Sequence, residues 1–335
     1  MSGTLKTFIQ YAFIFVVTGL LIWFSLRGLT GENKGEYLLK TWQAADKGWL
    51  IGMAAIAVLS HVLRAERWRM LLEPSGYKSR LSYSFLSLMV GYLVNLVIPR
   101  GGEVSRCYNL YKLDKTPVEI SFGTVVVERI VDLVCLLVLI SLAFIVEWDK
   151  LFAFIKTLPI GTSVDGSGLM ILILIGAGLI LLAVLGIWFI KRQKRLHAFV
   201  VKTWHGFKDG FLSIFRLRNK GLFLFYSLMI WGLYFLQSYA VILAFPQTAH
   251  LGIAAVLSLF AIGSIAMAAP LPGGTGSYHV LVPQGLVFLY NIPQADAVAF
   301  TFIFHGWQTA IMIVGGAISL IVTSIVLKKK KVNTG

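Results

Sequence analysis

Charged residues lie inside the long apolar segment 119–146, which contains the sequence VVVERIVDLV. Glu128 and Asp132 are four residues apart and share one face of a helix, whereas Arg129 points about 100° away from Glu128. An ionisable side chain within a membrane-spanning helix is costly and by default marks a functional site with a partner charge. Two interpretations follow: a site for a charged ligand, and a structural ion network that locks neighbouring helices together.

A second apolar segment, 81–98, runs into the sequence IPRGGEVS. Pro99 removes a helical hydrogen bond, and Gly101 and Gly102 allow the chain to turn tightly or to be approached closely. If a helix begins after these glycines, its free N–H groups and its partial positive charge form an anion site.

The same break carries charged side chains. Arg100 and Arg106 add full positive charge, and the arginine fork suits phosphate or carboxylate. We expect one of these arginines to pair with Glu128 or Asp132. Glu103 is expected to hold an arginine in place or to take up a proton. The alternative is a cytoplasmic loop with ordinary solvated charges.

A second break, AAPLPGGTGSYHVLVP, occupies 268–283. It combines residues that favour an unwound peptide with the polar groups that follow them: Pro272, Gly273, Gly274, Gly276, Tyr278 and His279. GGTG resembles a phosphate-binding loop but lacks the Lys-Ser/Thr of a P-loop, so we expect no nucleotide site. His279 and His305 could together shuttle a proton; alternatively, each bonds to a neighbouring helix.

Two basic, aromatic segments are predicted to lie at the membrane surface. HVLRAERWRMLL, 61–72, leaves an apolar span, and its Arg64, Arg67 and Trp68 suit the headgroup level. WHGFKDGFLSIFRLR, 204–218, is typical of an interfacial basic helix.

Composition places all these residues in a membrane protein. The chain is 57% hydrophobic and 13% charged, against about 25% charged residues in soluble domains. The formal net charge is +15, and the basic residues lie between the apolar runs. This placement indicates orientation in the membrane and contact with anionic headgroups rather than a nucleic-acid partner. The two cysteines have no metal-site spacing, and we expect no metal and no cofactor.

About 20 apolar residues cross a bilayer as a helix. The predicted full spans are 7–26, 48–64, 119–146, 167–190, 221–245 and 298–327. The first is interpreted as uncleaved, because its flank SLRGLTGENKG offers no convincing cleavage site.

Lys and Arg concentrate in 64–80, 100–118, 191–220 and 328–331, which the positive-inside rule assigns to the cytoplasm together with both termini. The apolar segment 81–98 then starts and ends on the cytoplasmic side of the membrane. The segment 251–290, which contains the second break, starts and ends on the opposite side. Each must enter the membrane, break and return, which is tolerated only where protein or a water-filled cavity covers the backbone.

The all-α chain then divides into two membrane halves, 1–150 and 151–335. Each half has three full spans and one re-entrant or broken-helix hairpin, so the second half is inverted relative to the first. Paired Gly/Pro interruptions in inverted halves indicate a transporter binding site near the midplane. The alternative is eight ordinary spans with kinks.

Four motifs in order, RAERWRMLL, NLVIPRGGEVSR, VVVERIVDLV and PLPGGTG, resemble the flippase-like family named for the transmembrane region of lysylphosphatidylglycerol synthase. The resemblance covers nearly the whole chain. It implies a polytopic helical domain with broken helices, which in the synthases moves an aminoacylated lipid that a separate soluble domain makes. We expect no such soluble domain here. The family usually has a glutamate where this chain has His279, which suggests a different headgroup or proton partner.

We therefore expect an inner-membrane lipid transporter, not an enzyme, for an anionic phospholipid or a polyprenyl-phosphate-type lipid. The two breaks would meet near the midplane, and Arg100 and Arg106 would hold the phosphate. Glu128 and Asp132 would orient the arginines or exchange protons, with the proton as the coupling ion. The acyl chains would stay in the lipid, so the groove that binds the headgroup would open sideways into the membrane.

Three other functions stay open. The first is an ion-coupled transporter of a small anionic solute, with a closed aqueous cavity. The second is a membrane enzyme, which needs a nucleophile–base pair or a clustered metal site that the sequence does not reveal. The third is an assembly partner for a cell-envelope enzyme.

Overall fold

The computed structural model describes residues 16, 18–29, 33–157, 194–269 and 271–332, and every element in them is helical. The protein is an all-α polytopic membrane protein. Four described helices are long and apolar enough to cross a membrane: α3 (Lys47–Leu72), α6 (Val118–Val146), α10 (Lys220–Ala244) and α13 (Gln294–Val332).

These four helices coincide with four of the predicted spans. The predicted span 167–190 lies outside the described residues, and so does most of 7–26, of which residues 18–26 are helical. The largest difference concerns α3, which continues to Leu72 instead of ending at residue 64.

Two pairs of shorter helices surround the predicted breaks. The first pair is α4 (Leu81–Asn95) and α5 (Gly101–Asp114), and the second is α11 (Ile253–Ala268) and α12 (Ser277–Tyr290). With 15 residues, α4 is only about 22 Å long, too short for a hydrocarbon core of about 30 Å. Helices of this length fit a hairpin that enters and returns.

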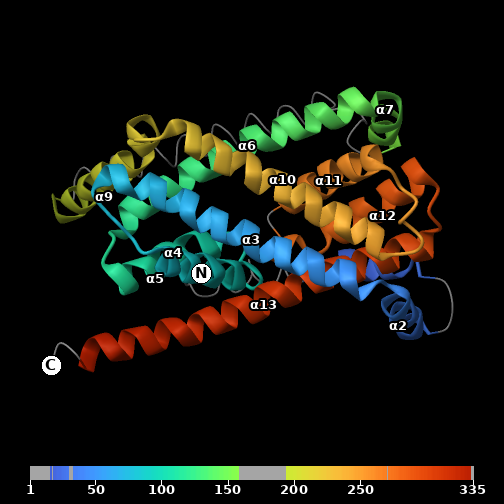
Figure 1. The fold of residues 1–335 in the computed structure, drawn as a ribbon, viewed down its shortest axis with the longest axis horizontal. Coiled ribbons are helices and arrows are strands. Elements are labelled where there is room, and N and C mark those ends of the chain that lie inside the picture. The colour runs from blue at the N-terminus through green and yellow to red at the C-terminus, as the bar shows by residue number, and fades with distance from the viewer. Residues whose placement is uncertain (1–15, 17, 30–32, 158–193, 270, 333–335) are drawn as a thin grey trace.

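The two hairpins approach each other from opposite ends of the bundle. In Figure 1, α4 and α5 lie toward α9 (Lys194–Leu212), whereas α11 and α12 lie toward α7 (Trp148–Thr157). Their tips meet, because Arg100 in the first break donates a hydrogen bond to the carbonyl oxygen of Ala268 at 3.1 Å.

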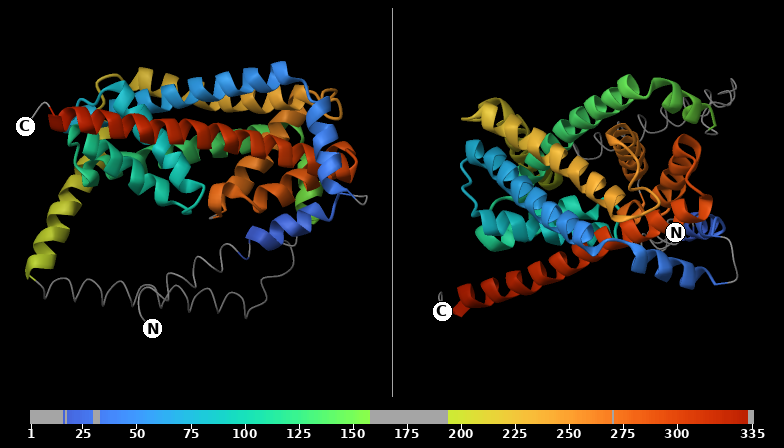
Figure 2. Two further views of the ribbon diagram at one scale, coloured as in Figure 1. Left: turned by 90° about the horizontal axis from the view of Figure 1, so that it is seen from below. Right: turned by 45° about the vertical axis from the view of Figure 1, so that its right-hand side comes forward.

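Long helices form the frame around the hairpins. Helix α3 packs along α10, and α13 packs against both α4 and α12. Figure 2 shows α13 running along the length of the molecule. At the end of the bundle opposite α9, Asp46 before α3 donates its backbone N–H to the carbonyl of Ala244 at 2.7 Å. The short helix α2 (Lys34–Ala44) lies at this same end (Figure 1).

Glycines allow two close helix contacts. A Cβ added at Gly102 would lie 2.2 Å from the carbonyl oxygen of Gly91, so α4 and α5 touch backbone to backbone. On the predicted interfacial helix α9, a Cβ at Gly210 would lie 2.1 Å from the carbonyl oxygen of Ile120 on α6. Only glycine permits approaches this close, and they fix both elements in place.

The second hairpin is tied to the end of α6 by a carboxylate. Glu147, directly after α6, accepts hydrogen bonds from Ser258 of α11 and Lys150 of α7, each at 2.7 Å, and from the hydroxyl of Tyr290 on α12. Burial raises the pKa of this carboxyl, but the three hydrogen bonds outweigh that effect and hold the pKa below its usual value.

Candidate functional site

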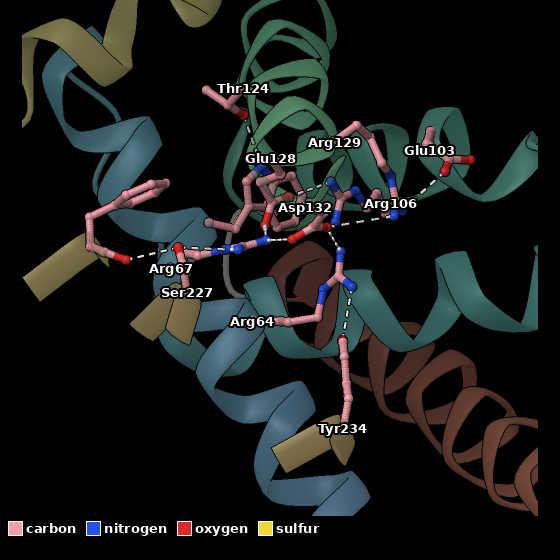
Figure 3. Close-up of polar contacts among 12 residues, drawn as sticks. Arg64, Arg67, Glu103, Arg106, Thr124, Glu128, Arg129, Asp132, Ser227 and Tyr234 are labelled. Atoms are coloured by element: carbon pink, nitrogen blue, oxygen red, sulfur yellow. Dashed lines mark hydrogen bonds and ion pairs between the residues drawn. The ribbon is translucent and has the colours of Figure 1, made fainter. Parts of the chain in front are cut away.

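Helices α3 and α6 bring two arginines onto one carboxylate. Arg64 and Arg67 both donate to Asp132, at 3.1 and 2.7 Å. Because the arginines are three residues apart on α3, they lie on one face of that helix. Figure 3 shows their guanidinium groups converging on Asp132.

Helix α5 contributes a third arginine. Arg106 donates to Glu128 at 2.5 Å, and Arg67 lies 3.5 Å from the other oxygen of the same carboxylate. The Arg106 guanidinium also lies over the ring of Trp68, 4.7 Å from its centroid. Arg67 and Glu128 are fully buried and Arg106 is 2% exposed, so these charges are held away from solvent.

The cluster is most open at Arg129. This side chain pairs with Glu103 of α5 at 3.1 Å and lies 3.9 Å from Asp132. Arg129 is 40% exposed and Glu103 is 17% exposed, whereas no other member exceeds 13%. The nearby residues Ile130 and Val104 are exposed apolar residues, so the open end adjoins an apolar surface.

Positive charge is in excess in this cluster. Four guanidinium groups, of Arg64, Arg67, Arg106 and Arg129, face three carboxylates, of Glu103, Glu128 and Asp132. Several arginine N–H donors are also buried without a partner, including both Nε and Nη1 of Arg106 and Nε of Arg129. Buried donors without partners are destabilising, and an anion placed among them would supply both the missing charge and the missing acceptors.

Neutral groups extend the cluster toward α10 and α4. Tyr234 and Ser227 of α10 accept hydrogen bonds from Arg64 at 2.9 Å and from Arg67 at 3.3 Å. One helical turn before Arg64, the ring of His61 lies 4.8 Å from that of Tyr92, and the His61 Nδ1 and the Tyr92 hydroxyl have no hydrogen-bond partner. These neutral residues were not predicted from the sequence.

The first break differs in part from its prediction. Arg106 pairs with Glu128 as expected, but Arg100 is exposed and bonds to the second hairpin instead of to a carboxylate. The backbone N–H of Gly101 bonds to Ile98 and that of Gly102 to the side chain of Asn95. These two donors are therefore satisfied within the hairpin and are not free for an anion.

The second break is a tight turn that the chain itself satisfies. Gly273, Gly274 and Gly276 have φ angles of 57, 71 and 105°, a region that glycine adopts readily. Pro272 begins the short 3₁₀ helix η4 (Pro272–Gly274), and the N–H of Gly274 bonds back to the carbonyl of Leu271.

The two histidines flank this turn. His305 of α13 lies 3.0 Å from the carbonyl oxygen of Gly273, and the N–H of Gly276 points to Nδ1 of His279 at 3.4 Å. Their ring centroids are 4.8 Å apart. Tyr278 is 7% exposed and belongs to the main hydrophobic core. The histidines thus adjoin each other and also bond to backbone, so both interpretations of the pair have a geometric basis.

The prediction that Arg64, Arg67 and Trp68 lie at the membrane surface is wrong, because all three are buried. Arg64 and Arg67 belong to the ion cluster, and Trp68 donates a hydrogen bond to Thr124 of α6. The three-residue spacing of Arg64 and Arg67 places them on one face of α3 but does not identify the helix that covers this face. The error came from ending the span at residue 64, which placed Arg64 at the last position of the span and Arg67 outside it.

Residues 9–316 match the family described as the lysylphosphatidylglycerol synthase TM region. The chain belongs to this family. It is 28% identical to glycosyltransferase AglD of Haloferax volcanii, over 84% of this chain and 50% of that protein. It is also 28% identical to UPF0104 membrane protein MJ1595 of Methanocaldococcus jannaschii, over 38% of each chain. The chain spans half or less of the length of these relatives, and no solved structure matches it.

Membership of the lysylphosphatidylglycerol synthase TM family supports a membrane protein related to lipid chemistry. Within the described residues, no group of three His, Cys, Asp or Glu side chains is placed to hold a metal ion. The buried arginine cluster is therefore the strongest candidate site in the described part of the chain.

Proposed function

We propose that the protein transports a lipid across the membrane by binding its phosphate at the cluster of Arg64, Arg67, Arg106 and Arg129. The substrate class is an anionic phospholipid or a polyprenyl-phosphate-type lipid. The observation that carries this proposal is the excess of guanidinium groups over carboxylates in the cluster, together with the buried arginine N–H donors that lack a partner. Arginine binds phosphate with paired, charge-assisted hydrogen bonds.

The surroundings of the open end favour a lipid over a small solute. Arg129 is the most exposed member of the cluster, and Ile130 and Leu133 beside it on α6 are 46 and 54% exposed. A phosphate that reaches Arg129 from this side can leave its acyl chains in the surrounding lipid. Transport of a small anionic solute, the alternative function, would instead need an enclosed aqueous path to the same arginines.

The two hairpins supply the moving parts in this proposal. The contact between Arg100 and Ala268 joins their tips, and separation of the tips would open the cluster to one side of the membrane or to the other. Glu128 and Asp132 keep the arginines oriented, and His279 and His305 are candidates for proton coupling.

The proposal assigns transport, not catalysis, to this chain, in the inner membrane with both termini in the cytoplasm. A relative is named a glycosyltransferase, and the family is named for a synthase. A cell-envelope enzyme that makes or uses the lipid is therefore a candidate partner.

Mass spectrometry of the lipids retained by the purified protein tests this function. We expect the wild-type protein to retain one phosphate-bearing lipid above its bulk fraction, and Arg129→Gln to lower that enrichment at least fivefold. Arg129 is partly exposed, so its substitution removes a binding group with little effect on folding.

Arg69→Gln is the matched control. Arg69 pairs with Glu66 at 2.5 Å, is 26% exposed and lies outside the cluster, so its substitution should leave the enrichment unchanged. Equal retention of bulk lipid by all three proteins would contradict the lipid site and favour the small-solute transporter.

A further inference from the structure

Glu103 is the most loosely held carboxylate of the ion cluster. Its Oε1 lies 3.1 Å from Arg129, and its Oε2 is buried without a hydrogen-bond partner. Asp132, in contrast, accepts hydrogen bonds with both oxygens. Oε1 of Glu128 also lacks a hydrogen bond but lies 3.5 Å from Arg67, so each oxygen of Glu128 has an arginine within ion-pair distance. Glu103 can therefore leave the cluster at the lowest cost in lost ion pairs.

Glu103 also belongs to a different element from the other two carboxylates. Glu128 and Asp132 lie on α6, whereas Glu103 lies in the first turn of α5, three residues after Arg100. Arg100 has a φ angle of 62° and forms the turn between α4 and α5. A rotation of the Glu103 side chain would remove its carboxylate from Arg129 and leave the α6 carboxylates in place, together with Arg106 of α5.

The position of Glu103 is the one that an incoming lipid phosphate would need. It adjoins Arg129, the most exposed guanidinium, and Val104 next to it is 54% exposed. The unpartnered N–H donors of Arg106 and Arg129 belong to the two arginines that flank this edge of the cluster (Figure 3). A carboxylate and a phosphate oxygen make the same kind of hydrogen bond to a guanidinium group.

We propose that Glu103 is a built-in competitor, whose carboxylate occupies the phosphate position until a lipid phosphate displaces it from Arg129. This inference rests on the proposed function and adds its regulation. The displaced Glu103 side chain turns away from Arg129 while Arg106 of the same helix stays paired with Glu128. Binding of the headgroup therefore removes one of the two ion pairs that join α5 to α6 in the described residues. When the lipid leaves, Glu103 returns and neutralises Arg129.

Binding of a short-chain lipid to the full-length protein in detergent tests this inference. The probes are dioctanoyl phosphatidylglycerol and inorganic phosphate, each titrated with wild type, Glu103→Gln and Glu103→Asp. Removing the competing charge should lower the Kd for the lipid at least tenfold in Glu103→Gln. The shorter carboxylate of Glu103→Asp, which reaches Arg129 less well, should give an intermediate Kd.

Glu66→Gln is the matched control, because Glu66 also pairs with an arginine but lies outside the cluster; its Kd should equal that of the wild type. An unchanged or higher Kd in Glu103→Gln would overturn the competitor role and make Glu103 a part of the holding scaffold. An equal gain for inorganic phosphate would overturn the lipid assignment and favour a free anion.

The two proposals fail in different ways. If wild type binds the lipid, Arg129→Gln loses binding and Glu103→Gln gains nothing, then only the competitor role is wrong. If none of the variants binds either probe, the proposed function fails and the competitor role fails with it.

Discussion

At the scale of single residues, Glu128 is the carboxylate on which the cluster depends. It is fully buried, accepts from Arg106 at 2.5 Å and lies 3.5 Å from Arg67. Within the described part of the chain, Arg106 has no other carboxylate partner. Loss of the Glu128 charge would therefore leave Arg106 buried with an uncompensated charge.

We expect Glu128→Gln to lower the stability of the protein by about 3–5 kcal/mol, the usual cost of breaking a buried ion pair on one side. The matched control Glu66→Gln removes a partly exposed partner of Arg69 and should cost about 1 kcal/mol or less. Thermal unfolding in detergent measures both. The double variant Glu128→Gln/Arg106→Gln should recover part of the loss, because it removes the unpaired charge as well.

Equal Tm values for Glu128→Gln and Glu66→Gln would contradict a structural role for this pair. Lipid retention measured on the same variants separates the two interpretations of the cluster. A variant that is destabilised yet still retains lipid would indicate a structural ion network, whereas loss of lipid at normal stability would indicate a binding role.

Residue types in the sequence identified part of this site. Glu128, Arg129 and Asp132 are charged residues within a long apolar segment, a pattern that is visible without a structure. The roles of Arg100 and of the break glycines were not visible, because they depend on which backbone groups the hairpin turn already satisfies. The pairing of Arg64 depends on the packing of α3 against α6, which spacing along one helix does not encode.

At the scale of elements, close packing of α4 on α5 sets the position of Arg106. A Cβ at Gly102 would lie 2.2 Å from the carbonyl oxygen of Gly91 and 2.5 Å from the side chain of Asn95. The first hairpin can bring its charged helix against α6 only if its two arms stay this close.

Gly102→Ala should therefore force the arms of the first hairpin apart and lower stability by about 1–3 kcal/mol or more, as overpacking does. The matched control is Gly232→Ala in α10, where nothing lies within 4 Å of the added Cβ. This control should be neutral or stabilising by up to about 1 kcal/mol, since alanine favours helix over glycine. Thermal unfolding distinguishes the two, and an equal Tm would contradict the packing role of Gly102.

The length of an apolar run predicts the positions of the long helices well. It predicts less well the parts of helices whose burial depends on packing against a neighbouring helix. The four helices α3, α6, α10 and α13 follow from apolar runs longer than any strand. The two hairpins followed from the charge of the flanking loops, because α4 and α11 are apolar runs like the others. The burial of the last two turns of α3 could not be predicted, because its arginines look like headgroup anchors until a partner helix is placed beside them.

At the scale of the whole molecule, the two hairpins enter the bundle from opposite ends. Lys78 precedes α4 and lies after the C-terminal end of α3, whereas His250 precedes α11 and lies near the N-terminal end of α3, where Asp46 bonds to Ala244. Helix α3 has 26 residues and is about 39 Å long, enough to separate these two loops by a bilayer. Both side chains are exposed.

Single-cysteine labelling tests this arrangement. In a background with Cys107 and Cys135 replaced by alanine, we expect a membrane-impermeant maleimide to label His250→Cys in intact cells, because its loop carries little charge. Lys78→Cys should be labelled only after permeabilisation, because its loop is strongly basic and is assigned to the cytoplasm. Labelling of both after permeabilisation is the control for reactivity. If both positions react in intact cells, the two hairpins enter the membrane from the same side. The hairpin tips, which the contact between Arg100 and Ala268 joins, could then not form a site that is reached alternately from the two faces of the membrane.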